Sequence, residues 1–211
     1  MEDKKHGSDS KPRKDISRRS FIRGAGLTTA GSVLLSSNAF AFEYEEGFQT
    51  GEEYGPNAMT ILMKVNGKIK SLSVEPRTTL ASALRDHLEL TGTKVACDRG
   101  SCSACTVYLE GLPVNACMMS VFDVGDKEVT TIEGISEDGE LHPVQQAFID
   151  HDASQCGYCT PGMIMSSVHL VENNANPTLE DVKKATRGNL CRCGTHPHVF
   201  KATLAATKKT I

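Results

Sequence analysis

The sequence predicts an α+β fold, in which a small sheet crossed by one helix precedes a region made only of helices. Apolar residues alternate from about residue 60, and Asn66-Gly67 is the strongest short hairpin signal a sequence can carry. After residue 141 the apolar side chains recur instead at intervals of three and four, which indicates helices. The chain has 211 residues, enough for two small domains after an N-terminal leader.

The sheet is expected to begin with a hairpin. Its first strand carries alternating apolar side chains at Ile61, Met63 and Val65. Residues 68–74 return as the second strand, but Ile69 and Leu72 fall on opposite parity. We therefore expect a bulge or a weakly defined register in the second strand.

One helix and further strands complete the expected sheet. The helix is marked by leucines four residues apart, Leu80, Leu84 and Leu88. Strands are expected at residues 106–109, 114–116 and 129–132, with a turn at Gly111 between the first two. A hairpin, a crossing helix and two or three more strands predict a β-grasp sheet.

The helical region is expected to follow a break at residues 133–141, which carry Gly, Ser and Asp. The first three helices are marked by Val144, Ala147 and Phe148, by Ile164, Val168 and Val171, and by residues 177–181. Thr160 is the expected N-cap of the second helix, with Pro161 in its first position. Phe200 and Leu204 mark a fourth, and four short helices can bury a common core. We therefore expect a β-grasp domain at 59–134 and an all-α four-helix bundle at 140–211.

The N-terminal segment reads as a targeting signal. Arg18-Arg19 precede Phe21-Ile22, a weakly apolar stretch follows, and Ala39-Phe40-Ala41 forms a small-x-small cleavage site. This pattern resembles a twin-arginine (Tat) signal, so residues 1–41 are excluded from the fold. A Tat signal predicts export of the folded protein to the periplasm. Residues 42–58 are acidic and predict a linker.

Charge and hydropathy exclude two classes of partner. Residues 1–41 hold eight of the 23 Lys and Arg residues and four of the 26 Asp and Glu residues. The rest of the chain keeps 15 basic and 22 acidic residues, a net charge of −7, which repels phosphate backbones and argues against nucleic acid. No apolar run reaches the ~18–20 residues of a membrane span, so none is expected.

Eight cysteines make two sets of four, and spacing distinguishes metal ligands from disulfides. The first set is spaced C-x4-C-x2-C-x11-C and consists of Cys97, Cys102, Cys105 and Cys117. Its first three members match the plant-type 2Fe-2S pattern. The small residues between them let the backbone wrap closely and direct N–H groups at the sulfurs. Zinc sites pair C-x2-C units and do not need this tight loop.

The second set is spaced C-x2-C-x31-C-x-C and consists of Cys156, Cys159, Cys191 and Cys193. Alone it could hold zinc, but beside a plant-type site it predicts a second 2Fe-2S cluster. Eight thiolates complete two clusters, so His151, His196 and His198 are not needed as ligands. Disulfides remain the alternative for an exported chain, with 105 possible pairings.

Further motifs surround these cysteines. They are Ala104-Cys105-Thr106-Val107, Leu141-His142-Pro143-Val144-Gln145-Gln146-Ala147-Phe148, Gln155-Cys156-Gly157-Tyr158-Cys159-Thr160-Pro161-Gly162 and Asn189-Leu190-Cys191-Arg192-Cys193-Gly194. Over residues 60–205 the chain resembles the small iron–sulfur subunit of the xanthine oxidase family of molybdenum hydroxylases, of the bacterial aldehyde, isoquinoline and nicotinate oxidoreductase type. Ala96 and Ser103 stand where glycine is frequent in that family, and both are small.

The resemblance implies a fold and a role. It implies a β-grasp 2Fe-2S ferredoxin-like domain followed by a four-helix-bundle 2Fe-2S-binding domain, both docked on a large subunit with molybdopterin cytosine dinucleotide. The helical-domain cluster would be proximal to molybdenum and the β-grasp cluster distal. Gln155 would contact the pterin; otherwise it is a polar residue at a helix end.

As such a subunit, the chain supplies no catalytic residue. The large subunit would oxidise an aldehyde or N-heterocycle, and this chain would pass electrons to an acceptor such as cytochrome c or a flavin subunit. Two alternatives stay open from the sequence. One is a free-standing two-cluster ferredoxin, and the other is a disulfide-stapled secreted binding module.

Overall fold

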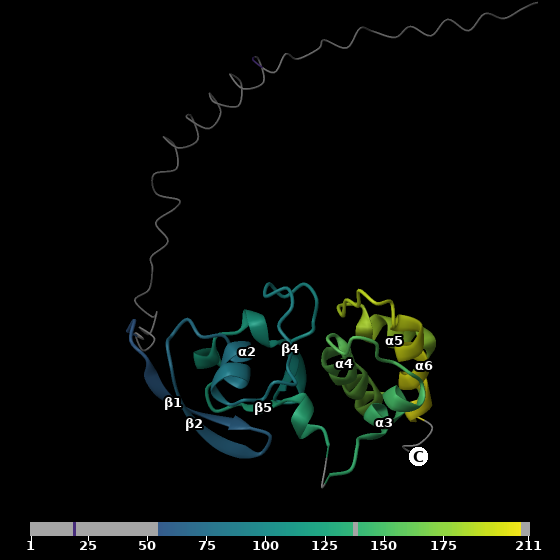
Figure 1. Ribbon diagram of the computed structural model, residues 1–211, viewed down its shortest axis with the longest axis horizontal. Helices are drawn as coiled ribbons and strands as arrows, with labels where there is room; N and C mark the ends of the chain where they lie inside the picture. The colour runs from purple at the N-terminus through teal and green to yellow at the C-terminus, as the bar shows by residue number, and fades with distance from the viewer. Residues whose placement is uncertain (1–18, 20–54, 137–138, 208–211) are drawn as a thin grey trace, which may run out of the picture. The chain divides into compact units, whose positions relative to one another are not determined.

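The computed structural model describes residues 19, 55–136 and 139–207 (Figure 1). The predicted signal at 1–41, except Arg19, and most of the predicted linker lie outside the described residues. Residues 55–136 and 139–207 belong to one unit of the chain, Tyr54–Ile211. None of the helices in these ranges is both long and apolar enough to cross a membrane.

The first half of this unit is a mixed five-stranded sheet. Its strands are β1 (Met59–Val65), β2 (Lys68–Val74), β3 (Thr106–Leu109), β4 (Leu112–Asn115) and β5 (Glu128–Thr130). The order across the sheet is β2-β1-β5-β3-β4, and only the β1–β5 pair is parallel. Asn66 and Gly67 both have positive φ, as a tight hairpin turn requires. This is the predicted β-grasp arrangement.

The prediction of a bulge or a weakly defined register in β2 is wrong. The β1–β2 ladder pairs every residue from Met59 with Val74 to Val65 with Lys68. Ile69 is 73% exposed, while Leu72 and Val74 are buried. β2 is an edge strand, so an apolar residue near its start can face solvent without any break in register. Ile69 and Leu72 therefore lie on opposite faces of one regular strand.

The crossing helix lies at the predicted leucines. It comprises α2 (Leu80–Ser82), capped by the Thr79 side chain, and η1 (Ala83–His87), a π-helical turn. Leu80 and Leu84 are fully buried in the sheet core, and Leu88 packs against it. Short 3-10 turns lie between β4 and β5, at η2 (Ala116–Met118) and η3 (Val121–Val124), and another follows β5, at η4 (Ile132–Gly134).

The second half consists of the helices α3 (Pro143–Asp150), α4 (Thr160–Asn173), α5 (Leu179–Thr186) and α6 (His196–Thr207). Helix α3 begins with a capping box, in which His142 Nδ1 accepts from Val144 N at 3.1 Å and Gln145 Oε1 accepts from His142 N at 2.9 Å. Helices α3, α4 and α6 share a core of small and apolar side chains, and α5 packs against α4 and α6 with Val182 and Thr186 buried. This is the predicted helical bundle.

One detail of the helical prediction is wrong. The N-cap of α4 is Cys159 and not Thr160, which is already inside the helix. The fourth helix lies where Phe200 and Leu204 predict it, and its buried face is formed by Val199, Ala202, Thr203 and Ala206. Phe200 and Leu204 themselves are half-buried.

Two hydrophobic clusters underlie the two halves, and one residue crosses between them. Tyr108 of β3 packs in the helical cluster, and its hydroxyl donates to the carbonyl of Met165 at 2.5 Å. Burial, followed by the charge of Glu172, raises the pKa of Tyr108, so the phenol keeps its proton. The predicted domain boundary between residues 134 and 140 stays a prediction, since residues 137–138 lie outside the described residues.

Candidate metal centres

The first cysteine set lies in the loop before β3 and in η2. Cys102, Cys105 and Cys117 are buried, and Cys97 is half-buried. Cys105 and Cys117 belong to the hydrophobic core of the sheet. None of the eight cysteines is joined in a disulfide, and the structure describes all eight. The disulfide-stapled alternative therefore has no support in the structure.

The four thiols of this set form two pairs. Cys97 is hydrogen-bonded through its side chain to Cys102, and Cys105 to Cys117. The charge of Cys102 also acts on Cys105, so the two pairs are neighbours. A 2Fe-2S cluster has two irons that take two cysteines each, so a pair of pairs fits its geometry. Among the described residues no three His, Cys, Asp or Glu side chains converge as a single-ion site would require.

Backbone N–H groups are directed at this set. Ser101 N donates to Cys97 Sγ at 3.2 Å, and Gly100 N donates to Cys117 Sγ at 3.4 Å. The loop achieves this with three left-handed residues, Asp98, Gly100 and Ser103. At Gly100 (φ +69) a Cβ would also lie 2.9 Å from Met118 Cγ, so glycine is required there. The loop thus provides the close backbone wrapping that its small residues predict.

The pKa values of these thiols diverge within the set. Backbone hydrogen bonding from Arg99, then the Cys102 side chain, lowers the pKa of Cys97 to about 7. Burial raises the pKa of Cys105 to about 12. A buried thiolate at Cys105 is costly by itself, and a bound cation would offset that cost. The residues present therefore fit an iron–sulfur cluster that binds thiolates.

The second set is built from two segments far apart in the sequence. Cys156 and Cys159 precede α4, and Cys191 and Cys193 lie between α5 and α6. Side-chain hydrogen bonds again define two pairs, Cys159 with Cys191 and Cys156 with Cys193. The charges of Cys156 and Cys191 both act on Cys159, which brings the pairs together. Cys159 is the N-cap residue of α4 without a capping hydrogen bond from its side chain, and burial raises the pKa of its thiol to about 12.

Sequence reasoning missed one residue of this second site. Thr195 is buried, its Oγ1 lies 3.1 Å from Cys191 Sγ, and its N donates to the same sulfur at 3.5 Å. Burial alone would raise the pKa of Cys191, but the Thr195 side chain and backbone, then Cys159, lower it to about 6. A threonine two residues after a C-x-C pair carries no sequence signal of this role.

The other predicted residues near the second site are a glutamine and two histidines. Gln155 is exposed beside Cys156 and Cys193, which are also exposed. His196 Nε2 lies 3.0 Å from Asn189 O, and His198 Nδ1 lies 3.0 Å from His151 O. These two imidazoles thus contact backbone carbonyls.

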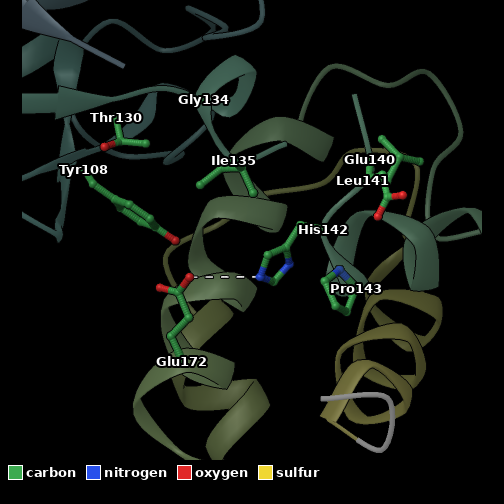
Figure 2. Close-up of a pocket in the computed structure, with 9 residues that line it drawn as sticks. All are labelled: Tyr108, Thr130, Gly134, Ile135, Glu140, Leu141, His142, Pro143 and Glu172. Atoms are coloured by element: carbon green, nitrogen blue, oxygen red, sulfur yellow. Dashed lines mark ion pairs between the residues drawn. The ribbon is translucent and has the colours of Figure 1, made fainter. Parts of the chain in front are cut away.

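A hollow of the described chain lies away from the cysteines. It has a volume of about 830 Å³ and is lined by Tyr108, Thr130, Gly134, Ile135, Glu140, Leu141, His142, Pro143 and Glu172 (Figure 2). Figure 2 shows His142 and Glu172 facing each other, with His142 Nε2 4.0 Å from Glu172 Oε1. No cysteine lines it, so it is separate from both candidate metal centres.

Two family models match the chain, one over each half. A 2Fe-2S iron-sulfur cluster binding domain matches residues 63–129, and a [2Fe-2S] binding domain matches residues 131–204. Each match contains one complete cysteine set. The first set lies within the first match and the second set within the second match.

Known proteins resemble the chain over most of its length. It is 35% identical to the aldehyde oxidoreductase iron-sulfur-binding subunit PaoA of Escherichia coli, over 95% of this chain and 92% of that one. It is 39% identical to the nicotinate dehydrogenase small FeS subunit of Eubacterium barkeri, over 72% of this chain and 98% of that one. A chain of the crystal structure of quinoline 2-oxidoreductase from Pseudomonas putida is similar at 35% identity and a TM-score of 0.69, over 72% of this chain and 95% of that one.

Proposed function

This chain belongs to the iron–sulfur subunits of the xanthine oxidase family of molybdenum hydroxylases, and we propose on that basis which residues carry its electrons and which partners it serves. Its cofactors are two 2Fe-2S clusters. The assignment rests on the arrangement of the eight cysteines. Each set of four consists of two hydrogen-bonded pairs, and the two pairs of a set lie next to each other. The relatives of this chain from Escherichia coli and Eubacterium barkeri are subunits of larger enzymes, which argues against a free-standing ferredoxin.

The proposed ligands are the two cysteine sets. One cluster is held by Cys97, Cys102, Cys105 and Cys117, and the other by Cys156, Cys159, Cys191 and Cys193. When bound, a 2Fe-2S cluster accepts and releases single electrons. The chain's own residues hold the thiolates, direct N–H groups from Gly100, Ser101 and Thr195 at the sulfurs, and keep water from the buried set.

The proposed direction of transfer runs from the helical half to the sheet half. The exposure of Cys156, Cys193 and Gln155 supports a face that a partner covers. That partner is a large subunit with molybdopterin cytosine dinucleotide, which Gln155 contacts, so the helical cluster is proximal. The β-grasp cluster is distal and delivers electrons to an acceptor such as cytochrome c or a flavin subunit.

The proposed substrate is an aldehyde or an N-heterocycle, oxidised on the large subunit. The names of the relatives support these two classes: an aldehyde oxidoreductase, a nicotinate dehydrogenase and a quinoline 2-oxidoreductase. This chain contributes binding, orientation and electrostatics to the clusters and no acid, base or nucleophile to the reaction.

A direct test combines metal analysis with native mass spectrometry of the complex purified from its host. We expect about four irons per copy of this chain, two separable S = 1/2 signals after dithionite reduction, and a co-purifying subunit that contains molybdenum. Zinc in place of iron, or half the iron, would contradict the two-cluster assignment. A fully loaded chain that purifies alone would favour the ferredoxin alternative.

We also propose periplasmic export by the Tat pathway, on the pattern around Arg18-Arg19. The double change Arg18→Lys with Arg19→Lys should leave the precursor in the cytoplasm with both clusters bound. Cell fractionation measures this, and Arg13→Lys in the same leader is the matched control. Normal export of the double variant would show that the twin arginines are not the export signal.

A further inference from the structure

The two cysteine sites contact each other through residues that adjoin the cysteines. Leu190 N, next to Cys191, donates to the carbonyl of Cys102 at 3.1 Å. Tyr158, between Cys156 and Cys159, donates its hydroxyl to the carbonyl of Val95 at 2.6 Å. Both contacts therefore join the backbone of the first site directly to a motif of the second.

The Ser103 carbonyl is the centre of this contact. Ser103 follows Cys102 and has φ 52, a left-handed conformation that is costly for a residue with a side chain. Its carbonyl accepts from Asn189 Nδ2 at 3.2 Å and from Thr106 Oγ1 at 2.8 Å. The left-handed turn therefore presents this oxygen to the helical half of the chain.

Asn189 is a fixed donor in this contact. Its side chain is 3% exposed, and its Oδ1 accepts from Ser166 Oγ at 2.9 Å. A carbonyl can only accept, so the amide must turn its NH₂ group toward Ser103 and its oxygen toward Ser166. The amide nitrogen of Asn189 therefore contacts the loop of the first site, and its oxygen contacts α4.

Gly162 lies against the same Ser103 carbonyl. It is buried in the first turn of α4, three residues after Cys159. A Cβ at this position would overlap the carbonyl oxygen of Ser103 and lie 3.1 Å from Ala104 Cα. Only glycine lets the first cysteine loop approach α4 this closely, although alanine has the higher helix propensity.

We propose that Gly162 and Asn189 are positioning residues for electron transfer, because both lie against the Ser103 carbonyl and thereby fix the separation of the two clusters. The inference rests on the proposed ligation by both cysteine sets. Transfer between two redox centres slows steeply as their separation grows, so a contact that sets the spacing also sets the rate. Neither residue is itself a proposed ligand.

The first test is Gly162→Ala in the complete complex, reduced fully with dithionite. Two paramagnetic clusters held close together split each other's EPR signals, and the splitting falls steeply with distance. We expect full iron content and two S = 1/2 signals, but loss of the splitting between them. Gly188→Ala is the matched control, because its Cβ would meet only the Ser103 hydroxyl, at 3.1 Å, which can rotate away.

The second test is Asn189→Asp, which keeps the acceptor for Ser166 but replaces the donor to Ser103 with a carboxylate oxygen. Loss of the splitting is expected again, with both clusters retained. Ser166→Ala is its control, since it removes only the bond on the far side of the amide. A merely structural role would lower the melting temperature without changing the splitting.

The outcomes separate this inference from the proposed function. Iron content and the presence of two signals test the two-cluster assignment, whereas the splitting tests the spacing. Wild-type splitting in fully loaded Gly162→Ala and Asn189→Asp would overturn the inference and leave the assignment intact. Loss of a cluster in both variants would also overturn it, since the two residues would then serve cluster binding.

Discussion

The two cysteine sites differ in how the chain builds them and in how far they are closed to solvent. The first is drawn from one short segment, residues 97–117, and three of its cysteines are buried. Two of these, Cys105 and Cys117, are part of the sheet core itself. The second joins segments that start at residues 156 and 191, and Cys156 and Cys193 are exposed.

This difference indicates separate demands on the two sites. A buried set such as the first must have its charge balanced locally, which the N–H groups of Gly100 and Ser101 provide. The second set relies on Thr195, and it leaves one side open. An open side suits a cluster that exchanges electrons with a partner, while the closed set is tied to the stability of its own fold.

The comparison is tested most strongly by removing one ligand from each site. Cys102→Ser and Cys193→Ser should each lose their own cluster, and half of the iron, because a serine hydroxyl ionises far less readily than a thiol at neutral pH. The other cluster should persist in each variant. Cys102→Ser should also lower the melting temperature more, since Cys102 is buried and Cys193 is exposed.

Iron analysis, EPR and thermal unfolding of the two variants measure these effects together. The two sites would not be independent in cluster binding if either single change emptied both of them. Equal losses of melting temperature would show that the buried site is no more closely tied to the core than the exposed one.

The next effect concerns the redox potential of the open site. Thr195→Val removes the hydroxyl 3.1 Å from Cys191 Sγ but keeps the backbone N–H at 3.5 Å. Hydrogen bonds to cluster sulfurs stabilise the more negative, reduced state. We therefore expect a lower potential for the helical cluster and an unchanged one for the β-grasp cluster in a redox titration followed by EPR.

The matched control for this change is Thr186→Val. Thr186 is also buried, but its hydroxyl donates to the carbonyl of Val182 within α5 and not to a sulfur. Its potentials should equal those of the wild type. A shift of both potentials in Thr195→Val would point to a general rearrangement and not to one lost hydrogen bond.

A smaller effect is expected where the two halves share a side chain. Tyr108→Phe keeps the ring in the helical core but removes the hydrogen bond to Met165 O. We expect a loss of about 1 kcal/mol in the free energy of unfolding, the usual net value for one hydrogen bond. Denaturant unfolding measures it. An unchanged free energy of unfolding would mean that the hydroxyl does not stabilise the packing of the sheet half against the helical half.

Much of this architecture was predictable because its signals are local. The Asn66-Gly67 turn, the leucines at 80 and 84 and the helix start at residues 177–181 each depend on residues within a few positions. The first cysteine set was also evident from the spacing within one loop, whereas the second joins two distant segments and was assigned only because it stands beside the first.

The features that sequence reasoning missed depend on distant packing. The prediction of a bulge or a weak register in β2 fails because periodicity cannot tell an edge strand from a central one. Tyr108 lies on a strand yet packs among helices, and Thr195 reaches Cys191 only through the turn before α6. The contact between Gly162 and Ser103 joins positions on opposite sides of the predicted boundary. Local patterns carry no information on such pairs.

The smallest expected effect concerns α5, the helix that leads to Cys191. Thr178 and Asp181 form its capping box: Asp181 Oδ2 accepts from Thr178 N at 2.8 Å and Thr178 Oγ1 at 2.7 Å, and Asp181 N donates to Thr178 Oγ1 at 3.3 Å. The Thr178 side chain, then its backbone N–H, lowers the pKa of Asp181. A carboxylate with a lowered pKa in the folded state stabilises the fold above its unfolded pKa, and this contribution is lost as the pH falls through the folded pKa.

Asp181→Asn should therefore lower the free energy of unfolding slightly at neutral pH, and the difference from the wild type should shrink in acid. Urea unfolding across that range measures it, and Glu180→Gln is the control, because Glu180 contacts Lys183 at the surface and takes no part in the cap. Since the cap lies at the start of α5 and Cys191 follows the end of that helix, the change should leave both clusters bound and at most broaden the EPR signal of the helical cluster. A difference that stays constant down to strong acid would show that the ionised carboxylate contributes nothing to this cap.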